Sequence, residues 1–235
     1  MIFANVHEHD EKAVNDISIC RISIDCKATV NIGDYARGGK SRGDNQALDH
    51  DTGCTEKYTP FGILDEDEHQ LTIEFGSSFK TSDFIVDSLQ NWWGKLPTKK
   101  KKVIKLIQIK SDNGPESSGR RTQFLKRMVE FVDRTHKSVH LLYYPPYHSK
   151  YNPIERCWGV LEQHWNGALL SDRDLMLGWA GSMKWKGTPP IISLNQKWYR
   201  KGLKLGRNAM KAIENRLERH PQLPKWDVLI KPVCR

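Results

Sequence analysis

The chain has 235 residues, of which 37 are Lys or Arg and 28 are Asp or Glu. Its net charge of +9 favours a polyanionic partner such as nucleic acid. The alternative is that the excess lysine only keeps the surface soluble. Its five cysteines form no CxxC pair, which excludes the common zinc motifs and a disulfide framework and favours a reducing cytosol. Since no apolar run could span a membrane and the N-terminus lacks the regions of a signal peptide, we expect a cytoplasmic protein with one main core.

The first third of the chain predicts strands separated by a long loop. Apolar residues alternate with polar ones over residues 17–35, which favours two strands that turn near residues 26–28, with Asp25 at the end of the first. Residues 37–60 are rich in Gly, Asp and basic residues, so they predict a loop that is long by the usual standards. A third strand follows at residues 71–75.

The middle of the chain alternates helices and strands. Helical spacing begins near Thr81 or Ser82, either of which could cap the helix. The charged connection at residues 99–102 leads to a strand at residues 103–110, whose lack of alternation predicts burial on both faces. The later elements are a helix at 119–136, a strand at 138–144, a helix with Asn152 as N-cap and Pro153 in its first turn, a helix near 171–183, a break at 188–190 and a basic helix near 206–219.

The order of these elements predicts the fold class. Three strands that can form a meander are followed by alternating units that add parallel neighbours. We therefore expect an α/β protein with a mixed five-stranded sheet and helices on both faces. We place its core in residues 1–168, and we expect residues 169–235 to form a helical, basic extension packed on or next to that core.

Three acidic residues lie where such sheets collect functional groups. Asp25 is in the first strand, Asp112 ends the fourth, and Glu155 lies in the first turn of the helix after the fifth. Functional groups gather outside the carboxyl ends of strands, so the fold could bring the three acids together. Unpaired carboxylates at close quarters are costly unless a cation neutralises them. Oxygen ligands of this kind suit two Mg²⁺ or Mn²⁺ ions, roughly 3.5–4 Å apart, in phosphoryl transfer.

Each acid also has a purely structural explanation. Asp25 could end a strand, Asp112 precedes an Asn-Gly turn, and Glu155 has the spacing of a capping box after Asn152. Each explanation would suffice for one acid alone, whereas the order of all three on the expected elements favours a shared site. Glu162, two turns after Glu155 on the same helix, is the alternative third acid.

Three stretches of the sequence resemble the acidic motifs of a known family. They are ISIDCK, SDNGPESS and PPYHSKYNPIERCWGVL, and they look like the three motifs of DDE transposases. The loop YARGGKSRG and the tail NQKWYRKGLKL are most similar to those of the ISAzo-thirteen-like insertion-sequence transposases. The resemblance covers nearly the whole chain, and its motifs are specific in combination.

The resemblance implies a ribonuclease-H-like fold, shared with retroviral integrases, and metal-dependent DNA cleavage at the ends of a mobile element, followed by strand transfer into target DNA. It implies that Asp25, Asp112 and Glu155 hold two Mg²⁺ or Mn²⁺ ions. Double-stranded DNA is the implied partner, in a nucleoid-associated complex that could contain several copies of the chain. The candidate DNA contacts are Lys40, Arg42, Asn113, Lys150 and Asn152.

Two departures from the family pattern keep other functions open. The first strand starts by about residue 17, which leaves no room for the usual N-terminal helix-turn-helix region, and the interval between the second and third acids is longer than usual. A ribonuclease-H-type nuclease is one alternative, distinguished by a preference for RNA–DNA hybrids. A catalytically silent DNA-binding remnant is the other, distinguished by DNA affinity without cleavage.

Overall fold

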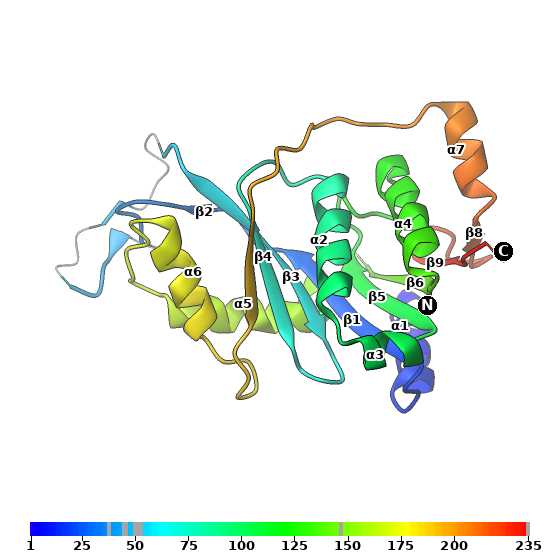
Figure 1. Ribbon diagram of the computed structural model, residues 1–235, viewed down its shortest axis with the longest axis horizontal. Coiled ribbons are helices and arrows are strands. Elements are labelled where there is room, and N and C mark those ends of the chain that lie inside the picture. The colour runs from blue at the N-terminus through cyan, green and yellow to red at the C-terminus, as the bar shows by residue number, and fades with distance from the viewer. Residues whose placement is uncertain (37–38, 44–46, 49–53, 146–147, 234–235) are drawn as a thin grey trace.

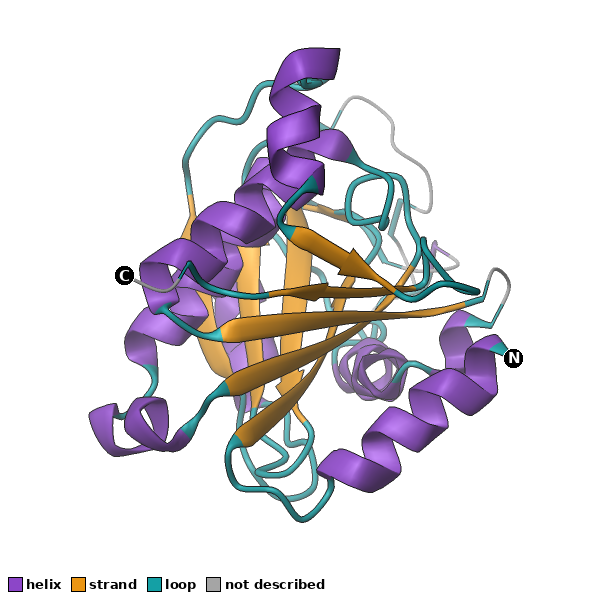
Figure 2. Cartoon of the chain, turned by 90° about the vertical axis from the view of Figure 1, so that its right-hand side faces the viewer, coloured by secondary structure: helices purple, strands orange, loops and turns teal. Residues whose placement is uncertain are grey.

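A computed structural model describes residues 1–36, 39–43, 47–48, 54–145 and 148–233, which form one sheet with helices on both faces (Figures 1 and 2). The strands are β1 (Ile19–Cys26), β2 (Val30–Asn31), β3 (Lys57–Asp65), β4 (Leu71–Gly76), β5 (Leu106–Asp112), β6 (Ser138–Tyr144), β7 (Ile191–Asn195), β8 (Leu217–Arg219) and β9 (Asp227–Ile230). The helices are α1 (Ile2–Ala13), α2 (Ser82–Lys95), α3 (Thr98–Val103), α4 (Thr122–Thr135), α5 (Pro153–His164), α6 (Arg173–Ser182) and α7 (Arg207–Glu214).

The central strands have the predicted mixed arrangement. β1, β3 and β4 form an antiparallel meander, and β5 and β6 add in parallel on the other side of β1, so the order is β4-β3-β1-β5-β6. The predicted fold class, an α/β protein with a mixed sheet and helices on both faces, is therefore confirmed. The sheet is wider than predicted, because β7 adds in parallel to β4 while β9 and β8 extend the edge at β6.

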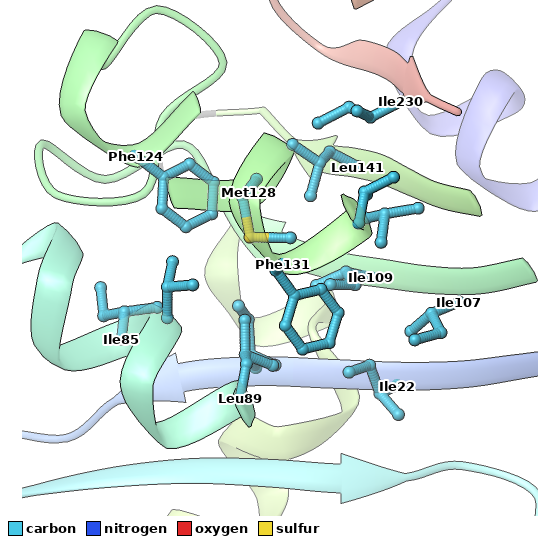
Figure 3. Close-up of a cluster of buried hydrophobic side chains, with 14 of the residues drawn as sticks. Ile22, Ile85, Leu89, Ile107, Ile109, Phe124, Met128, Phe131, Leu141 and Ile230 are labelled. Atoms are coloured by element: carbon cyan, nitrogen blue, oxygen red, sulfur yellow. The ribbon is translucent and has the colours of Figure 1, made fainter. Parts of the chain in front are cut away.

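One face of the sheet packs beneath α2 and α4. Alternate side chains of a strand point to opposite faces, so every second residue of β1, β5 and β6 turns toward these two helices. Figure 3 labels ten side chains of this buried cluster, which are Ile22, Ile85, Leu89, Ile107, Ile109, Phe124, Met128, Phe131, Leu141 and Ile230. The apolar faces of α2 and α4, which the helical spacing predicted, thus cover the centre of the sheet.

The opposite face is covered by α5 and α6 over β3 and β4, and by α1 over β5 and β6. Contacts beneath α1 are in part apolar, where Val6 packs on Leu142 and Tyr144, and in part polar. Lys110 of β5 is 1% exposed, and its Nζ lies 2.6 Å from carboxylate oxygens of both Asp10 and Glu66. A buried charge is tolerated when it is paired in this way. β5, the strand predicted to be buried on both faces, is indeed buried on both, and one of its faces is apolar and the other polar.

Several predicted boundaries were wrong. The second long strand of the meander is β3, whereas only the two-residue β2 forms within residues 27–35. Part of the predicted loop 37–60, namely residues 37–38, 44–46 and 49–53, lies outside the described residues. Residues 99–102 belong to α3, because lysine is a good helix former, and the next strand begins at Leu106. Helix α1 was not predicted.

The C-terminal residues lie along both edges of the sheet. After β7 the chain crosses to α7, and then β8 and β9 return beside β6 (Figure 1). α6 and α7 confirm the two helices expected here, although α7 ends at Glu214 and residues 217–219 form β8. The division at residue 168 remains a prediction. In the described part of the chain, no helix is both long enough and apolar enough to cross a membrane.

Candidate active site

Asp25 and Asp112 lie at the same edge of the sheet. Asp25 is the penultimate residue of β1, which lies between β3 and β5, and it is paired with Gly62 of β3. Asp112 is the last residue of β5. Because β1 and β5 run in parallel, their carboxyl ends meet at one edge, and the two aspartates come from neighbouring strands.

The pKa of Asp25 is raised, as expected for a buried carboxyl group close to other acids. Burial raises the pKa of Asp25 to about 6, and the negative charges of Asp112 and Glu155 act in the same direction. A hydrogen bond from Trp158 and the positive charge of Lys80 oppose this rise. The fold therefore brings the three predicted acids, from β1, β5 and α5, within electrostatic reach of one another.

The N-terminus of α5 is bonded to β1. The buried side chain of Asn152 donates from Nδ2 to the carbonyl oxygen of Ile24 at 3.1 Å, and its Oδ1 accepts from the hydroxyl of Ser23. Ser23 Oγ in turn accepts from the backbone N–H of Ile154 at 3.0 Å. Asn152 occupies the predicted N-cap position, but its side chain does not cap the helix; Ser23 satisfies that backbone donor instead. These bonds fix the first turn of α5, which contains Glu155, against β1.

Trp158 connects the same helix directly to Asp25. Its indole Nε1 donates to Asp25 Oδ2 at 2.9 Å, three residues after Glu155 on α5. Gly62 of β3 makes this approach possible, because a Cβ atom there would lie 2.6 Å from both Ile154 Cδ1 and the Trp158 ring. The aromatic ring thus packs on the backbone opposite Asp25, while its polar edge holds the carboxylate.

The turn after β5 closes the other side of the site. Gly114 lies against Asp112, since a Cβ at Gly114 would be 3.3 Å from Asp112 Oδ1. The turn is fixed by two hydrogen bonds to its carbonyl oxygens: Ser82 at the start of α2 donates to Glu116 at 2.7 Å, and Tyr143 donates to Ser117 at 2.8 Å. A small cleft is lined by these turn residues, both aspartates, Cys26 and Lys80.

Cys26 lies beside the acids but is poorly suited to be a nucleophile. Burial raises the pKa of its thiol to about 12, and the neighbouring Asp25 and Asp112 carboxylates also favour the neutral form. The thiolate is the reactive species of cysteine. The chemistry that this site can support is therefore that of its carboxylates.

The two candidates for the third acid have different surroundings. Glu162 forms an ion pair with Lys27, whose Nζ also lies 5.9 Å from the centre of the Trp165 ring. The charge of Glu155, in contrast, is one of those that raise the pKa of Asp25. Glu155 is therefore within electrostatic reach of Asp25, whereas Glu162 belongs to an ion pair further along α5; which of them is the third acid remains a prediction.

Two of the five candidate DNA contacts are used within the protein. Asn152 is only 1% exposed, so the prediction that it contacts DNA was wrong: its amide joins α5 to β1. Arg42 donates from Nε to the carbonyl of Asn166 at 2.7 Å and from Nη2 to that of His164 at 2.9 Å, and it lies over the Trp179 ring. The guanidinium of Arg42 therefore satisfies carbonyl groups at the C-terminal end of α5.

The other three candidates have different degrees of exposure. Lys40 and Lys150 are exposed, and the ammonium of Lys150 lies 5.3 Å from the centre of the Tyr151 ring. Asn113, directly after Asp112, is half-buried and accepts a hydrogen bond from the backbone N–H of Gly119 at 3.3 Å. A role in DNA binding remains a prediction for these three residues.

Several residues of the site were not predicted. Trp158 was expected to be a core residue and it is one, but its indole N–H also faces Asp25. The sequence does offer one indication of this role: Trp158 lies three residues after Glu155, which places both side chains on one face of the helix. Ser23 and Gly62 carry no comparable signal, because their roles depend on the approach of α5 to β1 and β3.

Comparisons with known proteins agree with this arrangement. The family model described as Rhodopirellula transposase DDE domain matches residues 1–232. Among solved structures, the HTLV-2 integrase catalytic core domain, in complex with magnesium in a dimeric form, has a TM-score of 0.41 and 13% identity, over 74% of this chain and 93% of that chain. The comparison with curated proteins finds no match.

The fold and the family match place the chain among the polynucleotidyl transferases, the enzymes that cut and join nucleic acid strands. Within that class, the chain belongs to the Rhodopirellula transposase DDE domain family. The resemblance to DDE transposases stated from the three acidic motifs is therefore confirmed.

Proposed function

We propose that Asp25, Asp112 and Glu155 are the catalytic acids of this transposase domain and that they bind two divalent metal ions, Mg²⁺ or Mn²⁺. The observation that supports the proposal is the placement of the three acids at one edge of the sheet, on the ends of β1 and β5 and in the first turn of α5, which is bonded to β1. The pKa of Asp25, which is raised by burial and then by the charges of Asp112 and Glu155, agrees with this placement. The set consists of oxygen donors only, which is the chemistry that Mg²⁺ and Mn²⁺ prefer. When bound, such ions polarise the phosphate and activate the attacking oxygen.

The surrounding residues hold these acids in place. Ser23 and Asn152 fix the first turn of α5 against β1, so Glu155 has a set position relative to Asp25. Trp158 orients the Asp25 carboxylate through Oδ2 and leaves Oδ1 for a ligand. The helix N-terminus beside Glu155 favours negative charge, which offsets part of the repulsion among the acids. Lys80, exposed and near Asp25, is the local positive charge.

The substrate in this proposal is double-stranded DNA, at the ends of a mobile element and then at the target. The net charge of +9 supports a polyanionic substrate. Exposed Lys40 and Lys150 are the candidate phosphate contacts that the structure leaves at the surface. Water, and then a DNA 3′-hydroxyl, would be the attacking groups, because the one cysteine beside the acids holds its proton.

The test compares two substitutions on one helix. Glu155→Gln removes a proposed metal ligand, whereas Glu162→Gln removes the partner of Lys27 and serves as the matched control. We expect saturable Mn²⁺ binding in the parent protein, measured by calorimetry, that is weakened in Glu155→Gln and Asp112→Asn and retained in Glu162→Gln. Cleavage of DNA carrying the element ends should follow the same pattern.

Each outcome of this comparison has a defined meaning. Loss of Mn²⁺ binding in Glu162→Gln but not in Glu155→Gln would move the third ligand to Glu162. DNA affinity without metal binding or cleavage would support a silent remnant. Preferred cleavage of RNA–DNA hybrids would support a ribonuclease-H-type nuclease.

A further inference from the structure

A second cluster of metal-binding side chains lies away from the three acids. It consists of His9 of α1, His140 of β6 and Asp227 of β9, and their ligand atoms all lie within 4.8 Å of one another. His140 is paired in register with Gln108 of β5, four residues before Asp112. At roughly 3.3 Å per residue, this places the cluster about 13 Å along the sheet from the carboxyl ends of the strands.

The ligand atoms of this cluster are close enough together for one metal ion to contact all three residues. Asp227 Oδ2 lies 3.3 Å from His9 Nε2, and Asp227 Oδ1 lies 2.7 Å from His140 Nε2. Two ligands bound to zinc at about 2.0–2.1 Å in tetrahedral geometry are themselves about 3.3 Å apart. The two distances run to different oxygens of Asp227, so the carboxylate and the imidazoles would have to rearrange by a fraction of an ångström or more around an ion held by all three residues.

The chemistry of the cluster also differs from that of the acidic site. Asp227 is 5% exposed; burial alone would raise its pKa, but hydrogen bonds from His140, His9 and Asn5 hold the pKa well below its usual range. The cluster thus offers one carboxylate and two imidazoles. Imidazole nitrogens suit Zn²⁺ and Co²⁺, whereas Mg²⁺ prefers an all-oxygen set.

We propose that His9, His140 and Asp227 bind one Zn²⁺ ion in a structural site that joins α1 and β9 to β6. Asn5 supports the site by donating to Asp227 Oδ2 at 2.9 Å, as outer-sphere hydrogen bonds orient metal ligands. The two imidazoles bind as neutral ligands through Nε2, with the proton on Nδ1. The ion connects residue 9 to residue 227, so it links the two ends of the described chain.

The test uses the whole chain carrying Asp112→Asn and Glu155→Gln, so that the acidic site does not contribute metal binding. In this background, His9→Gln removes one imidazole but keeps an amide donor for Asp227. His7→Gln is the matched control, because His7 is exposed on the same helix and is paired with Glu11. Zn²⁺ affinity is measured by calorimetry, and Co²⁺ coordination by visible absorption.

We expect one Zn²⁺ per chain, with an affinity that falls at least about tenfold in His9→Gln and is unchanged in His7→Gln. Co²⁺ should give the intense visible bands of a four-coordinate site, and excess Mg²⁺ should not displace it. The absence of Zn²⁺ binding, equal affinity in the two histidine variants, or displacement by Mg²⁺ would overturn the proposal. None of these results depends on the activity of the acidic site.

Discussion

Replacing Asp25 by Asn should stabilise the metal-free protein at neutral pH. The substitution keeps the shape of the side chain and an oxygen that can accept the hydrogen bond from Trp158. It removes a charge that burial and two neighbouring carboxylates disfavour. The direction is unusual for a substitution at a proposed catalytic residue, and it follows from the burial of the Asp25 carboxylate and its repulsion by the neighbouring acids.

The magnitude follows from the pKa of Asp25. A pKa of about 6 in place of the ordinary 3.8 corresponds to about 3 kcal/mol, at about 1.36 kcal/mol per pKa unit. Because the folded-state pKa is raised, the folded protein holds this proton more tightly than the unfolded chain does. Stability is therefore lost as the pH rises from 3.8 to about 6; the full cost is present above this window and absent below it.

The assay is urea denaturation of the parent and Asp25→Asn proteins in chelator-treated buffer, from pH 4 to pH 8. The free energies of unfolding should agree near pH 4 and differ by up to about 3 kcal/mol above pH 6, with the variant more stable. Added Mn²⁺ should stabilise the parent and leave the variant nearly unchanged. A stability difference that does not vary with pH would refute the idea that Asp25 ionises against its neighbours.

The remaining predictions concern the residues that position the acids and one buried charge. Trp158→Phe removes the donor to Asp25, so the pKa of Asp25 should rise further, measured by carboxyl NMR titration without metal; an unchanged pKa would contradict the role of the indole. Gly62→Ala should destabilise the protein by about 1–3 kcal/mol in urea denaturation, because its methyl group would overlap the Trp158 ring; a neutral effect would mean that α5 can move freely. Lys110→Met should cost about 3–5 kcal/mol in the same assay, because it leaves the partly buried Glu66 carboxylate without its ammonium partner, whereas the exposed Lys12→Met should cost less than about 1 kcal/mol; equal effects would show that the buried ammonium has no special weight.

The strands that carry the two aspartates could be predicted because their signal is local. Alternation marks β1, an apolar run marks β5, and each acid falls at the end of its strand. β3 could not be predicted in the same way, because Pro60 and Gly62 break the expected pattern. The last residue pair between β1 and β3 is Cys26 with Phe61, and Pro60 lies one residue beyond that pair. Gly62 lies where α5 packs against β3.

Helix α1 was missed for a different physical reason. Its buried apolar residues are few, Val6 and Ala13, and many of its other contacts with the sheet are polar, so the apolar stripe that marks a surface helix is weak. Asn5 and His9 reach Asp227, and Asp10 pairs with Lys110, more than 90 residues away along the chain in every case. Such pairs satisfy one another only after folding, and nothing in the local sequence of either partner predicts them.

The candidate site depends on contacts of the same long-range kind. Sequence spacing placed Glu155 in a first turn, but the position of that turn is set by Ser23 and Asn152, and the depth of α5 by the space at Gly62. These contacts bury Asp25 and hold it near two other carboxylates; burial first, and repulsion second, raise its pKa to about 6. A cation that enters the cluster removes that repulsion, so the strain imposed by the fold becomes part of the affinity for the metal. Contacts that only the folded chain can make thus determine the geometry of the acids and, in the proposed function, their preference for a divalent ion.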